Sequence, residues 1–103
     1  MKISVLLPYK ENFTVNSAGA VSLFVNDICY ESIYKNSTYI FGNTIYKDKL
    51  SANYINLDLK RNLFQSTSKK YVESFLNFQK DKKTDLIEIH NRPNYIKQIR
   101  KEF

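Results

Sequence analysis

Glycine, cysteine and histidine are scarce in this sequence, and each shortage excludes a class of site. The 103 residues include two glycines, two prolines, one cysteine and one histidine. A dinucleotide fingerprint needs three closely spaced glycines and a P-loop needs two with a lysine, so Gly19 and Gly42 provide neither. One cysteine and one histidine cannot form a zinc cluster. Few glycines and prolines also leave no flexible linker, so we expect one small domain without a metal or a resident cofactor.

The single cysteine and the amino-terminal segment bear on localisation. Cys29 cannot form an intramolecular disulfide, which suits a reducing compartment. It lies at the apolar edge of a predicted helix, which favours a packed thiol over a nucleophile paired with His90. The apolar run Ile3–Leu7 is too short for a signal peptide or a membrane span. We therefore expect a cytoplasmic protein, with the inner face of the membrane as a second location.

The net positive charge raises two possible partners, a nucleic acid and an anionic membrane surface. The net charge is +6, yet 13 of the 16 basic residues are lysines and they are scattered along the chain. A nucleic-acid partner is therefore not expected. Contact with an anionic membrane needs only a diffuse basic surface, so a peripheral membrane contact remains open.

Four short apolar segments predict strands. The continuous run Ile3–Leu7 is typical of a strand that is buried on both faces. Thr38–Phe41 is rich in β-forming residues, Tyr54–Leu57 is a weaker segment, and Leu86–Ile89 is the fourth.

Three segments with helical spacing lie between and after these strands. The first has Val21, Phe24, Val25 and Ile28 on one predicted face. The second has an apolar stripe of Tyr71, Val72, Phe75, Leu76 and Phe78, with Ser66, Thr67 or Ser68 as its N-cap. Pro93 suits the first turn of the third, where Ile96, Ile99 and Phe103 keep helical spacing.

The alternation of strands and helices predicts an α/β fold, a Rossmann-like three-layer sandwich with a mostly parallel sheet of about four strands. Right-handed crossovers predict the strand order 3-2-1-4. The polar loops after strands one and four, 8–19 and 90–94, then converge at the switch point of the sheet. Strand four would lie at an unprotected edge. Residues 1–103 therefore look like a truncated domain, or a small protein that completes itself by oligomerising.

His90 directly follows the fourth strand and is our candidate catalytic residue. Its pKa range lets an imidazole donate or accept a hydrogen bond near neutral pH. Glu88 lies two residues earlier on the same side of the strand, where it could orient the imidazole or be neutralised by Arg92. The structural alternative is that His90 caps the next helix while Glu88 and Arg92 form an ion pair.

The first loop offers two further candidates. Gly19 stands where a helix begins, and free amides at a helix start can bind phosphate. The alternative is that this glycine only permits close packing of the helix on the sheet. Lys10, beside Tyr9, Glu11 and Asn12, could contact a polar ligand.

Three segments carry a resemblance to a known family. Lys2–Pro8, Ala18–Val21 and Asp85–Pro93 resemble the amino-terminal domain of family-four glycosyltransferases, which are retaining enzymes of the GT-B type with two Rossmann-like domains facing a cleft. The similarity spans essentially the whole chain, and its most specific part is His-Asn-Arg-Pro after the fourth strand. The chain is thus similar to a partial acceptor-side domain.

The resemblance implies roles for individual residues. In this family the amino-terminal domain holds the acceptor and the carboxy-terminal domain binds most of the nucleotide-sugar, which is a co-substrate. Gly19 would face the donor phosphates and the acceptor, and His90 would project toward the transferred sugar. Asn91 and Arg92 would be supporting contacts. The family needs no metal.

Two departures from the family pattern affect the expected activity. The first loop has Ala18-Gly19 in place of paired glycines. The donor-binding domain, which stabilises the departing nucleotide diphosphate, is missing from these residues. We therefore predict a glycosyltransferase fragment that acts on a saccharide or lipid-linked acceptor and is inactive alone. The rival prediction is a non-catalytic α/β binding module that oligomerises.

Overall fold

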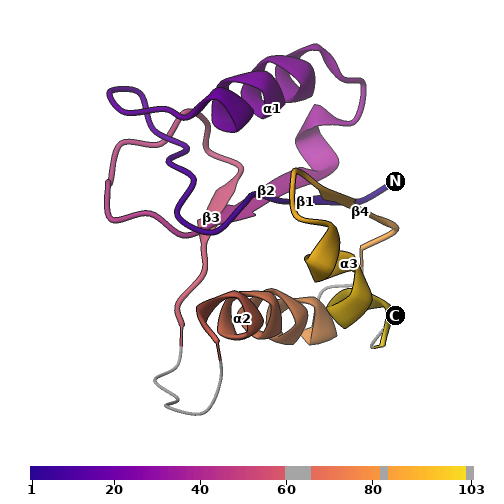
Figure 1. The fold of residues 1–103 in the computed structure, drawn as a ribbon. Coiled ribbons are helices and arrows are strands. Elements are labelled where there is room, and N and C mark those ends of the chain that lie inside the picture. The colour runs from indigo at the N-terminus through magenta and orange to yellow at the C-terminus, as the bar shows by residue number, and fades with distance from the viewer. Residues whose placement is uncertain (60–65, 82–83, 102–103) are drawn as a thin grey trace.

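The computed structural model describes residues 1–59, 66–81 and 84–101. Its elements are β1 (Ile3–Leu6), α1 (Ala20–Glu31), the 3-10 helix η1 (Lys35–Ser37), β2 (Thr38–Gly42), β3 (Tyr54–Asn56), α2 (Thr67–Asp81), β4 (Leu86–Ile89) and α3 (Pro93–Arg100). The strands form one sheet in the order β3-β2-β1-β4, and each neighbouring pair is parallel. The predicted Rossmann-like α/β fold and its strand order are confirmed (Figure 1).

Helices cover the sheet on both sides, with α1 on one face and α2 and α3 on the other (Figure 1). Side chains of β1 alternate between two cores. Val5 belongs to the cluster under α1 together with Val25, whereas Leu6 belongs to the cluster under α2 and α3. This alternation explains the uninterrupted apolar run, because a central strand needs apolar side chains on both faces.

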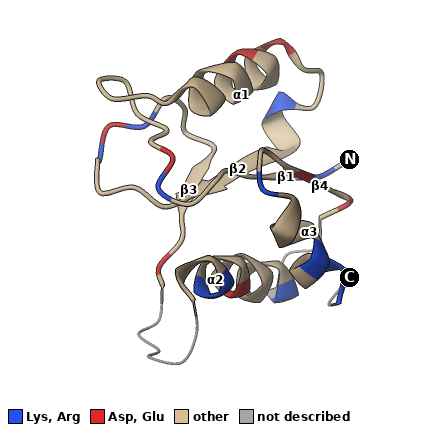
Figure 2. Cartoon of the chain, in the orientation of Figure 1, with Lys and Arg blue, Asp and Glu red and all other residues tan. Residues whose placement is uncertain are grey.

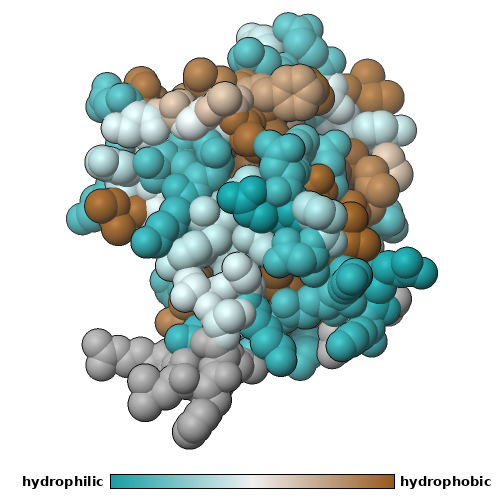
Figure 3. Space-filling view, in the orientation of Figure 1, coloured by the Kyte–Doolittle hydropathy of each residue, from teal (hydrophilic) through white to brown (hydrophobic). Residues whose placement is uncertain are grey.

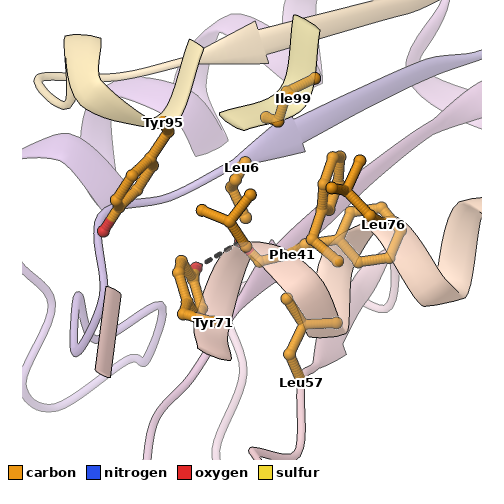
Figure 4. Packing of buried hydrophobic residues seen from close by; sticks show 9 residues of the cluster. Leu6, Phe41, Leu57, Tyr71, Leu76, Tyr95 and Ile99 are labelled. Carbon is orange, nitrogen blue, oxygen red and sulfur yellow. Dashed lines mark hydrogen bonds between the residues drawn. The ribbon is translucent and has the colours of Figure 1, made fainter. Parts of the chain in front are cut away.

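The core under α2 combines aliphatic side chains with packed aromatic rings (Figure 4). Phe41 of β2 meets Phe75 and Phe78 of α2 edge to face, with ring centroids 5.1 and 5.0 Å apart. The buried hydroxyl of Tyr71 donates to the carbonyl oxygen of Leu7 at 2.7 Å. Burial raises the pKa of Tyr71, so the hydroxyl stays protonated and remains a donor. This bond ties α2 to the end of the central strand.

Local signals place the helix starts where the sequence predicts them. The Ser66 hydroxyl accepts the Lys69 backbone N–H at 3.2 Å, which identifies Ser66 as the cap of α2. Pro93 is in the first turn of α3.

The predicted buried face of α1 is wrong in two of its four positions. Phe24 and Ile28 are 56% and 49% exposed, whereas Ser22 and Val25 are buried. The helix is rotated because the Ser22 hydroxyl turns inward to the carboxylate of Glu11, at 2.7 Å. A local apolar count could not register this distant polar partner.

A similar rotation affects α3. Tyr95 is buried and Ile96 is 44% exposed, whereas the stripe predicted from spacing contains Ile96. Tyr95 is drawn inward because its hydroxyl accepts the backbone N–H of Tyr9 at 3.2 Å. Ile99 is buried as predicted. Phe103, the last member of that stripe, lies outside the described residues.

Substitution Tyr71→Phe should lower the free energy of unfolding by about 1–2 kcal/mol, because the Leu7 carbonyl loses its buried donor while the ring remains. Urea denaturation followed by circular dichroism measures the change. Tyr30→Phe is the matched control, since Tyr30 is 72% exposed. Equal losses in the two variants would contradict the role of the buried hydrogen bond.

Candidate functional site

Two loops meet the carboxyl edge of the sheet, one after β1 and one after β4, because these strands are parallel neighbours. The first loop begins with a turn in which the Glu11 N–H donates to the Pro8 carbonyl at 3.1 Å. Within that turn Lys10 has φ of 66°, and in the second loop Asn91 has φ of 55°. Both are left-handed backbone positions, which non-glycine residues rarely adopt. The loops are therefore held in specific turns.

The amino terminus of α1 already holds a carboxylate. Glu11 Oε2 accepts hydrogen bonds from the Ser22 backbone N–H at 3.3 Å and the Ser22 hydroxyl at 2.7 Å. A negative group at this end of a helix is stabilised by the free N–H groups and the helix dipole.

Gly19 makes room for that carboxylate. Its φ is −75°, so the backbone conformation does not require glycine. A Cβ at this position would collide with the carboxyl group of Glu11. Gly19 thus permits close approach at the helix start, and the group that occupies the space is the carboxylate of the chain's own Glu11. Contact of Gly19 with a phosphate or an acceptor stays a prediction.

His90 is oriented by Glu88. Its Nε2 lies 2.9 Å from Glu88 Oε2, and the side chains are 19% and 48% exposed, respectively. The imidazole also meets the ring of Phe24 edge to face, with centroids 6.1 Å apart. Of the two roles that the sequence allowed for Glu88, orientation of His90 is therefore the one observed.

The contacts of Arg92 and the start of α3 argue against the alternative in which His90 caps α3 and Glu88 pairs with Arg92. The Arg92 guanidinium donates to the carbonyl oxygen of Asn91 at 2.7 Å, whereas the Glu88 carboxylate faces His90. Arg92 itself is the N-cap residue of α3, and its side chain makes no capping hydrogen bond. His90 is consequently free of a capping role.

Lys10 is a further predicted site residue, and it has a contact within its own loop. The Lys10 ammonium lies 5.7 Å from the ring centroid of Tyr9. The Tyr9 N–H donates to the Tyr95 hydroxyl, which joins the first loop to α3. The structure therefore brings His90, Glu88 and Phe24 together, and groups Gly19 with Glu11 and Ser22. Sequence reasoning missed Phe24 and Ser22; a serine on an otherwise apolar helix face was the available signal for the second.

Comparison of the chain with models of protein families, with curated proteins and with solved structures gave no match. In the described part of the chain, no helix is long and apolar enough to cross a membrane. Within 1–59, 66–81 and 84–101, no three His, Cys, Asp or Glu residues group so that they could hold a metal ion. Arguments about function consequently depend on the residues of the two loops.

Glu11→Ala should lower the free energy of unfolding by about 1–2 kcal/mol, since α1 loses its cap and Ser22 its buried partner. Thermal or urea denaturation measures the loss. Glu31→Ala, at the exposed end of the same helix, is the control. Gly19→Ala should be costly with Glu11 present and less costly in the Glu11→Ala background. Additive losses in the double variant would contradict the contact between Gly19 and Glu11.

Burial raises the pKa of the Cys29 thiol, and the nearby Glu88 carboxylate raises it further. A raised thiol pKa lowers the thiolate fraction at a given pH, and the thiolate is the nucleophile. Alkylation by iodoacetamide at pH 8 should therefore be slower in the folded than in the unfolded chain. Glu88→Gln should accelerate it, whereas Asp27→Asn should leave it unchanged. An unaltered alkylation rate in Glu88→Gln would contradict an effect of the Glu88 carboxylate on the Cys29 thiol.

Proposed function

We propose that this chain is the acceptor-side part of a glycosyltransferase that moves a sugar from a nucleotide-sugar to a saccharide or lipid-linked acceptor. The observation that carries the proposal is the imidazole of His90, held by Glu88 at the carboxyl end of β4. The resemblance of the three segments 2–8, 18–21 and 85–93 to family-four glycosyltransferases gives this geometry its chemical interpretation. The donor-binding domain is the required partner, and the chain is inactive without it.

The hydrogen bond to Glu88 decides what His90 offers to a ligand. When Nε2 carries the proton that it donates to the carboxylate, Nδ1 presents a lone pair. A sugar hydroxyl is the matching donor. The exposed ring of Phe24 lies against the imidazole and supplies an apolar surface for the C–H face of a sugar ring. His90 is thus equipped for a hydroxyl-bearing ligand.

The carboxylate of Glu11 supports an acceptor role over a donor role. It occupies the start of α1, where a nucleotide diphosphate would otherwise find free N–H groups. A phosphate there would meet a like charge or would have to displace Glu11. Binding of the donor phosphates chiefly by another domain agrees with this arrangement. Lys10, Asn91 and Arg92 then remain candidates for contact with the acceptor.

A lipid-linked acceptor would bring the protein to a membrane surface. Lys and Arg residues occur along α2 and α3, on the side of the sheet opposite α1 (Figure 2). Basic side chains at a surface are attracted to anionic lipids. The proposed peripheral contact at the inner face of the cytoplasmic membrane would use this side.

A second candidate function is a non-catalytic binding module. The unpaired edge at β4 favours it, because an open edge is a common site of association. Size-exclusion chromatography distinguishes the two: a stable, well-folded dimer supports the oligomerising module. A monomer that gains transferase activity only with a donor-binding domain supports the enzyme.

His90→Ala should reduce turnover by an order of magnitude or more in a longer polypeptide that supplies the donor-binding domain, because a transition-state contact is lost. Transfer from a radiolabelled nucleotide-sugar measures kcat. Tyr30→Phe, distant in the chain and exposed, should leave kcat unchanged.

The chain alone permits a complementary measurement. In the 103-residue protein labelled with nitrogen-15, methyl glycosides at millimolar concentration should shift the amide signals of His90 and Asn91. The His90→Ala variant should lose these shifts. Unchanged kinetics in the longer variant, or no response to a panel of glycosides, would overturn the proposed role of His90.

A further inference from the structure

Among residues 1–59, 66–81 and 84–101, no strand pairs with the outer side of β4. β4 is the last strand of the sheet order, and β1 is its neighbour on one side. The Leu86 N–H donates to the Lys2 carbonyl at 3.2 Å, so Leu86 faces β1. Backbone groups alternate in direction along a strand, and the N–H and C=O groups of Ile87 and Ile89 consequently face the open side. Such a row is a template for another strand.

Apolar side chains flank this edge on the side of α1. Phe24 and Ile28 lie one helical turn apart, and Leu86 is on the strand beside them; they are 56%, 49% and 48% exposed, respectively. The contact between Phe24 and His90 places this face of α1 next to β4. Figure 3 shows hydrophobic side chains over α1 and along the side of the molecule where β4 lies. These three apolar side chains are exposed to solvent in the part of the chain that the structure describes.

A groove flanks the same edge on the side of α3. It has a volume of ≈ 390 Å³, and its apolar walls are formed by Leu86, Ile87, Ile89, Ile96 and Ile99. One acidic and one basic residue, Asp85 and Arg100, also line it. Ile96 is 44% exposed. Apolar surface therefore lies on both sides of one open strand edge, which is the setting of a strand buried on both faces rather than of a solvated edge.

The charges around the α1 side are acidic although the whole chain is basic. Asp27 and Glu31 are exposed on α1, in line with Phe24 and Ile28, and Asp85 and Glu88 are exposed on or beside β4. Red segments mark these two elements in Figure 2. The net charge of the chain is +6, yet four of its ten acidic residues lie on α1 and on or beside β4. A strand that binds here is matched by lysine or arginine.

We propose that the β4 edge binds an extended apolar segment of another polypeptide, which pairs with Ile87 and Ile89 as an added strand and carries basic residues beside its apolar run. A second copy of this chain fits less well, because a symmetric contact at β4 brings the same four carboxylates onto both sides of the interface. This proposed binding site is the open edge of β4, whereas His90 lies in the loop that follows β4. It does not depend on His90 or on sugar transfer, but it uses the same β4 edge as the second candidate function.

The test uses the 103-residue protein and a fluorescein-labelled synthetic peptide, Lys-Lys-Val-Ile-Val-Ile-Val-Lys-Lys. Fluorescence anisotropy should show saturable binding. A control peptide with proline for the central valine lacks a backbone N–H and should not bind. Amides of Ile87 and Ile89 should become protected from hydrogen exchange when the first peptide is bound, which locates it on the edge.

Variants at exposed positions distinguish specific binding at the β4 edge from non-specific hydrophobic binding elsewhere on the surface. Leu86→Lys and Phe24→Lys should each weaken the binding of the peptide about tenfold. Ile45→Lys, at a side chain that is 89% exposed in the β2–β3 connection, should leave it unchanged. Circular dichroism checks that all three variants are folded.

Three outcomes overturn the proposal. The first is no saturable binding, and the second is equal binding of the two peptides. The third is a dimer in light scattering that excludes the peptide, which would assign the edge to a second copy.

Discussion

The pairing of β1 with two parallel neighbours is the constraint on which the rest of the structure depends. β1 is hydrogen-bonded to β2 on one side and to β4 on the other, in registers that align Leu6 with Phe41 and with Ile89. Since all three strands point the same way, the loops that follow β1 and β4 emerge at one edge. Helices must then cover both faces, and each β1 side chain enters one of two cores. The candidate site is a consequence of this pairing.

The strands could be predicted because their signals are local. A continuous apolar run identifies β1, and right-handed crossovers fix the order once four strands are known. The buried faces of α1 and α3 depended instead on distant hydrogen bonds. Ser22 is turned inward by Glu11 and Tyr95 by Tyr9, partners separated by 11 and 86 residues. Helical spacing alone contains no information about such partners.

In the candidate site too, some contacts could be predicted from local sequence and others depend on distant residues. The contact between Glu88 and His90 follows from the two-residue period of a strand, and sequence could anticipate it. The carboxylate at the start of α1 could not be foreseen, because its position depends on the turn at Pro8–Glu11. Phe24 was assigned to the core, yet its ring reaches His90. Sequence thus located the residues that bear the chemistry better than it located their surroundings.

The hydrogen bond between the starts of the neighbouring strands β1 and β4 has a consequence for the order of folding. The Lys2 N–H donates to the Asp85 carboxylate at 2.7 Å, between residues 83 positions apart. Contacts at such separation close a long loop and form late. β4 contacts a neighbouring strand on one side, so β4 with α3 should be the last unit to dock and the first to open. His90 belongs to this unit, and the candidate site would therefore assemble and dissolve with it while the remaining three strands stay folded.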